Sequence, residues 1–102
     1  MDIQMLTEKM NDFVRSKGWY EPGSSRMQSP RNLAISLCLE TSEVLELFQW
    51  TDTCNNIEEL ESELADVTLY LLQLASVSKI DLEAAIIKKL NKNIQREWDI
   101  PI

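Results

Sequence analysis

The chain has 102 residues, a formal net charge of −7 and a pI near 4.5. This length suits one domain over residues 1–102, with a single hydrophobic core. So acidic a chain lacks the basic surface with which proteins bind nucleic-acid polymers, and we exclude that class of partner. Two glycines and three prolines are few, which favours long helices and an all-α fold.

The first ten residues, MDIQMLTEKM, do not resemble a secretion signal, because a basic start and an apolar stretch are missing. No apolar run approaches the ~20 residues that cross a bilayer. We therefore expect a cytoplasmic protein with no membrane partner.

The apolar residues recur at helical spacing in four segments. Gly18 ends the first helix, Ser29 and Pro30 begin the second, and Asp81 caps the fourth. The predicted helices cover about residues 2–17, 30–50, 57–79 and 82–98. The second and third are apolar over more than one face, so one protomer would leave apolar surface uncovered. We therefore predict that homo-oligomerisation completes a helical bundle.

Two pairs of acids interrupt the apolar stretches of the second and third helices. The pairs are Glu40-x-x-Glu43 and Glu63-x-x-Asp66. Projected at 100° per residue, each pair lies inside the apolar arc of its helix. Carboxylates in such positions lose hydration, and at ~5 Å with an effective dielectric near 20 each pair repels by roughly 3 kcal/mol. A positively charged ligand is therefore expected between them.

The chain contains no histidine, so the ligands of such a cation would be oxygens. Oxygen ligands select Mg²⁺, Mn²⁺ or Ca²⁺ over zinc and copper. An EF-hand is excluded because the acids are helical, and a ferritin-like di-iron site normally uses Glu-x-x-His. What remains is a Mg²⁺ site, with Mn²⁺ as a substitute, that completes its shell with substrate phosphates.

Other side chains could complete a triphosphate site. Lys89 and Asn93 are i,i+4 neighbours on the fourth helix and could meet phosphates, although a solvent-exposed helix face explains them equally well. Four aromatic residues could stack on a base: Trp19, Tyr20, Trp50 and Tyr70. Tyr70 shares the face of the acids, which favours a functional role, whereas Trp50 also suits packing at a helix end.

The two acid pairs, with nineteen residues between them, resemble the signature of the MazG-like all-α nucleoside triphosphate pyrophosphohydrolases. Further blocks resemble the dCTP-pyrophosphatase branch of that family. These blocks are Pro30-Arg31-Asn32-Leu33, Phe48-Gln49-Trp50 and Lys89-Leu90-Asn91-Lys92-Asn93 with Arg96. The similarity spans about residues 30–98.

The resemblance implies Mg²⁺-dependent hydrolysis of a deoxynucleoside triphosphate to monophosphate and pyrophosphate by a homodimer or homotetramer. It favours a pyrimidine such as dCTP and a role in cleaning the nucleotide pool. It implies four metal ligands, Glu40, Glu43, Glu63 and Asp66, with Glu43 the candidate to position the attacking water. It assigns the phosphates to Lys89 and Asn93, and the nucleoside to Trp50 and Tyr70.

One stretch departs from that branch, which carries an aromatic residue and a histidine shortly before its Pro-Arg-Asn. Here residues 24–29 read SSRMQS, so the base preference could differ from dCTP. Two alternatives stay open. The first is a phosphoribosyl-ATP pyrophosphohydrolase, which the Pro-Arg-Asn-Leu and Phe-Gln-Trp blocks disfavour. The second is a non-catalytic helical module that binds an ion or a basic partner.

Overall fold

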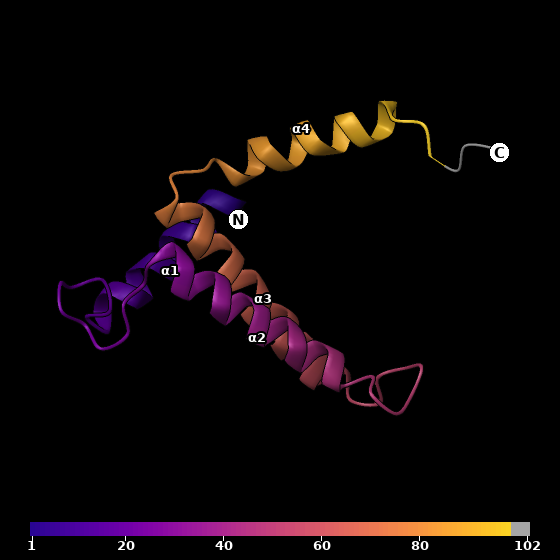
Figure 1. The fold of residues 1–102 in the computed structure, drawn as a ribbon, viewed down its shortest axis with the longest axis horizontal. Coiled ribbons are helices and arrows are strands. Elements are labelled where there is room, and N and C mark those ends of the chain that lie inside the picture. Colours follow the sequence, from indigo (N-terminus) through magenta and orange to yellow (C-terminus); the bar gives the residue numbers. More distant parts are fainter. Residues whose placement is uncertain (99–102) are drawn as a thin grey trace.

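The computed structural model describes residues 1–98, and this part of the chain forms four helices and no strand (Figure 1). The helices are α1 (Ile3–Ser16), α2 (Pro30–Glu46), α3 (Ile57–Val77) and α4 (Leu82–Gln95). The predicted all-α class with four helices is therefore confirmed. No helix among residues 1–98 is long and apolar enough to cross a membrane.

Each helix begins after a side chain that accepts a hydrogen bond from a backbone N–H of the first turn. These N-caps are Asp2, Ser29, Asn56 and Asp81. The long loop between α1 and α2 turns at Gly18 and Gly23, whose φ angles of 73° and 83° strain any residue with a Cβ.

The expectation that the second helix reaches Trp50 is wrong, because α2 ends at Glu46. Beyond Glu46 the backbone N–H groups of residues 47–49 donate to carbonyls three residues earlier, which tightens the chain into turns. Trp50 therefore lies outside the helix, 87% exposed. The fourth helix likewise ends at Gln95, before Trp98.

The helices α2 and α3 lie side by side as one arm, and α1 packs across α3 (Figure 1). The small core consists of Met10, Val14 and Leu72, with Trp19 and Tyr20 of the loop packed against it. In contrast, α4 makes only a small contact with α1 and projects from the body as a second arm.

This arrangement leaves far more surface than a compact domain would. The radius of gyration is 16.8 Å, whereas a compact chain of this length has about 13 Å. The accessible surface is 8260 Å², against about 5,900 Å² for a folded monomer of this mass. Much of α4's apolar side is uncovered, including Ile87, Leu90 and Ile94, each more than half exposed.

Candidate functional site

Three carboxylates meet where α2 and α3 face each other. Glu40 and Glu43 are three residues apart on α2, so their side chains share one face of that helix. Glu63 comes from the facing side of α3. One oxygen of each of the three side chains lies within 4.8 Å of the others, a spacing that could hold a metal ion.

The electrostatics of this cluster are unfavourable without a cation. The Oε2 atoms of Glu40 and Glu63 are buried, and no described residue donates a hydrogen bond to either. Burial, followed by hydrogen bonding with Glu43 and the nearby negative charges, raises the pKa of Glu40 from 4.5 to about 7. Hydrogen bonding with Glu43 and then burial also raise the pKa of Glu63.

Within residues 1–98, no basic side chain forms an ion pair with these acids. The ion pair in this part of the chain joins Arg15 and Asp12 on the surface of α1. Buried carboxylate oxygens without a donor are costly, and a hard divalent cation is the ligand that satisfies several of them at once. The donor set of the cluster, oxygen throughout, fits Mg²⁺ or Mn²⁺.

Asp66, the fourth predicted ligand, lies one turn after Glu63 on α3 and is not among the three mutually close carboxylates. Its charge nevertheless contributes to the raised pKa of both Glu40 and Glu63. Asp66 also lines a neighbouring cavity. It therefore connects the carboxylate cluster to that cavity.

The cavity has a volume of about 640 Å³ and lies between α1, the loop over residues 18–29, α2 and α3. Its wall is mostly apolar and aromatic, and includes Met10, Phe13, Trp19, Leu33 and Tyr70. The Trp19 ring is fixed from two sides. Phe13 meets it edge to face at 5.8 Å between centroids, and the Arg26 guanidinium carbon lies 5.4 Å from its centroid.

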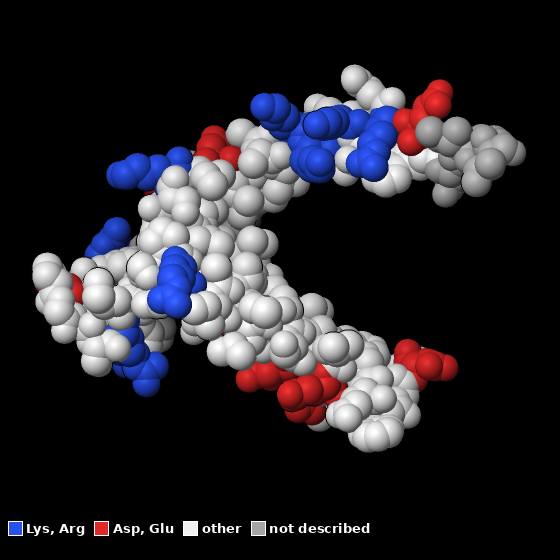
Figure 2. Space-filling view, viewed as in Figure 1, with Lys and Arg blue, Asp and Glu red and all other residues white. Residues whose placement is uncertain are grey.

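The structure thus brings Glu40, Glu43 and Glu63 together. It places Tyr70 beside Asp66 in the cavity wall, but it does not gather every predicted site residue. Trp50 is exposed in the turn after α2 and does not line the cavity. Lys89 and Asn93 lie on α4, and Figure 2 shows the Lys and Arg side chains of that arm well apart from the acidic side chains of the α2–α3 arm. Within one protomer Lys89 and Asn93 are therefore remote from the cluster.

Two features of the cavity were missed by the sequence reasoning. Arg26 and Gln73 both line it, yet Gln73 was assigned no role and Arg26 entered only as part of the stretch SSRMQS. Gln73 carried a usable signal, because it is the lone polar residue in the apolar run Leu71-Leu72-Gln73-Leu74-Ala75. Arg26 carried none, because no periodic pattern describes the loop that places it.

The chain is similar to known nucleotide pyrophosphohydrolases. A family model of the MazG nucleotide pyrophosphohydrolase domain matches residues 28–100. The chain is 35% identical over 94 residues to dCTP pyrophosphatase 1 of Mus musculus and 33% identical to that of Homo sapiens. Each match covers 83% of this chain and 52% of the relative, so the chain spans about half the length of these curated relatives.

A solved structure of similar fold is a pyrophosphatase from Archaeoglobus fulgidus. It is 34% identical in sequence and superposes with a TM-score of 0.76. The match covers 89% of this chain and 87% of that one.

Proposed function

The chain belongs to the MazG nucleotide pyrophosphohydrolase family, and we propose that it hydrolyses a deoxynucleoside triphosphate to the monophosphate and pyrophosphate. The observation that carries the proposal is the carboxylate cluster with two buried, unpartnered oxygens beside an aromatic-lined cavity. An anionic triphosphate next to four acids requires divalent cations between them, and the cavity offers room for the nucleoside.

We assign the metal to Glu40, Glu43, Glu63 and Asp66, with Mg²⁺ as the cofactor and Mn²⁺ as a substitute. The ion supplies the positive charge that the triphosphate oxygens need in this acidic site. Glu43 is the most exposed of the three clustered acids, so its carboxylate can reach solvent and take the proton of an attacking water. Asp66, which lines the cavity, would link the other metal ligands to the bound nucleoside.

The nucleoside occupies the cavity, where Tyr70 and Trp19 offer aromatic surfaces for the base. A pyrimidine such as dCTP is the favoured substrate, in keeping with relatives that carry the name dCTP pyrophosphatase 1. Removal of unwanted nucleotides from the pool is the role that this activity would serve.

We propose that the phosphate-binding residues come from a second copy of the chain. Lys89 and Asn93 lie on the projecting α4, whose apolar side is exposed and whose basic side chains complement an acidic α2–α3 arm. We propose a homodimer, or a tetramer of such dimers, in which α4 of one copy lies against the α2–α3 arm of the other. Trp50, exposed at the far end of that arm, would border a nucleoside bound by the neighbouring copy.

The proposal is tested by a panel of deoxynucleoside triphosphates with Mg²⁺, following release of pyrophosphate. Glu43→Gln and Asp66→Asn should each lower the rate by at least about 100-fold while the helical circular dichroism is unchanged. Glu61→Gln is the matched control, because Glu61 is an exposed acid on α3 that is absent from the cluster. Absence of turnover with every nucleotide would refute the proposal and favour a non-catalytic module.

A further inference from the structure

Among residues 1–98, Gln73 is the one polar residue that is buried, with 4% of its surface exposed. It lies in the middle of α3, three residues after Tyr70, and lines the same cavity. An amide in such a position is costly unless its hydrogen-bonding groups are satisfied. Its partners therefore show what the cavity wall offers to a ligand.

The first partner is Gln28 of the loop. The Gln28 Nε2 donates to the backbone carbonyl of Arg26 at 2.6 Å, and a carbonyl can only accept. The Gln28 amide is therefore oriented with its Oε1 toward α3, where it accepts from Gln73 Nε2 at 2.6 Å. This contact in turn fixes which end of the Gln73 amide is the nitrogen.

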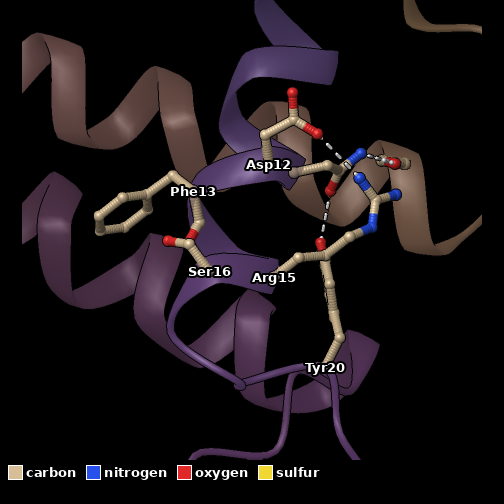
Figure 3. Close-up of polar contacts among 7 residues, drawn as sticks. Asp12, Phe13, Arg15, Ser16 and Tyr20 are labelled. Carbon is tan, nitrogen blue, oxygen red and sulfur yellow. Dashed lines mark hydrogen bonds and ion pairs between the residues drawn. The ribbon is translucent and has the colours of Figure 1, made fainter.

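The second partner is Tyr20, which points from the loop back to α1 in Figure 3. Its hydroxyl donates to Asn11 Oδ1, and Asn11 Nδ2 donates to Ser76 Oγ at 3.0 Å. Since its own proton is used, the Tyr20 oxygen accepts, and Gln73 Nε2 lies 3.4 Å from it.

Both hydrogens of Gln73 Nε2 are thus directed at protein acceptors. Gln73 lines the cavity, and its Oε1 receives no hydrogen bond from residues 1–98, so this oxygen is the atom of the amide left free to accept from a ligand. Gln28 and Tyr20 hold this orientation and are positioning residues. An amide that could turn freely would offer a donor or an acceptor equally, whereas this one offers an acceptor.

We infer that Gln73 determines base specificity by accepting a hydrogen bond from the exocyclic amino group of the base. The inference rests on the proposed function and adds the class of base, one that carries an amino group, such as cytosine or adenine. Uracil or hypoxanthine would present a carbonyl oxygen at that place. Two acceptors would then face each other in a largely apolar cavity, with neither satisfied.

Two nucleotide pairs that differ in this group test the inference: dCTP with dUTP, and dATP with dITP. We expect kcat/KM of the wild-type protein to be at least ~10-fold higher for the amino member of at least one pair. Gln73→Met keeps the volume and removes the acceptor, so the ratio should fall to within about 3-fold of unity. Gln28→Met frees the Gln73 amide to turn and should lower the ratio part of the way, while Gln4→Met, an exposed glutamine of α1, should leave it unchanged.

Turnover of both members of each pair at similar kcat/KM would overturn the inference and leave the proposed function standing. Retention of the wild-type ratio by Gln73→Met would equally overturn it. No turnover of any nucleotide would refute the proposed function, and the inference with it. The wild-type ratios and Gln28→Met, at the edge of the cavity, still decide the question if Gln73→Met does not fold.

Discussion

Replacement of Glu40 by glutamine should stabilise the metal-free protein and at the same time remove its response to Mg²⁺. Glu40 is the clustered acid whose pKa is raised to about 7, chiefly by burial and then by Glu43 and the other acids. Glutamine has nearly the same shape and no charge. The substitution therefore removes repulsion within the cluster together with one proposed metal ligand.

The magnitude follows from the pKa. Between the ordinary value of 4.5 and about 7, the folded protein binds more protons at Glu40 than the unfolded chain does, so the free energy of unfolding falls as pH rises through this window. At about 1.4 kcal/mol per unit the full cost above pH 7 would be about 3 kcal/mol. Because the side chain is partly exposed, solvent screening reduces this to about 1–2 kcal/mol.

Thermal unfolding at pH 7.5 measures both effects. In EDTA, Glu40→Gln should raise the Tm by about 5–10 °C relative to wild type. Wild type should gain about 2.7 kcal/mol of stability at Mg²⁺ near 100 times its Kd, and the variant should gain far less. The exposed Glu61→Gln serves as the control and should behave as wild type in both media. A lower Tm of Glu40→Gln in EDTA, or an undiminished gain with Mg²⁺, would refute the account of the cluster.

Three further results are expected. The Tm of the wild-type protein in EDTA should fall from pH 5 to pH 7.5 and level off above pH 7.5, and saturating Mg²⁺ should abolish that fall. A Tm that rises over this range contradicts the raised pKa of Glu40. Trp19→Leu should raise KM by roughly 5- to 30-fold with a smaller effect on kcat, because the ring walls the cavity; an unchanged KM would place the nucleoside elsewhere. Mixing inactive Glu43→Gln and Lys89→Ala subunits should restore about one quarter of wild-type activity. Half of the dimers are then mixed, and each mixed dimer holds one intact site out of two. No recovery would mean that Lys89 serves the acids of its own chain.

The helices and the acid cluster were accessible from sequence because both depend on local geometry. Caps such as Ser29 and Asp81 mark helix starts through hydrogen bonds within one turn. The i,i+3 spacing of Glu40 and Glu43 places them on one face in any α-helix. The apolar arcs around the acids then predicted that these faces would meet, and the structure brings Glu40, Glu43 and Glu63 together.

The rest depends on how separate elements are arranged, which spacing does not encode. Lys89 and Asn93 are well placed on one helix face, yet the direction in which α4 leaves the body is set by the short connection after α3. Trp50 lies outside α2 because tighter turn bonds replace the helical ones after Glu46. The orientation of Gln73 depends on Gln28, a loop residue 45 positions away in the sequence.

The central claim is tested most directly by phosphorus NMR of the products formed from dCTP with Mg²⁺. The proposed cleavage between the α- and β-phosphates predicts dCMP and pyrophosphate in equal amounts, with no dCDP or inorganic phosphate at any stage. Formation of dCDP with inorganic phosphate, or an unchanged dCTP spectrum under conditions in which other deoxynucleoside triphosphates are also stable, would contradict it.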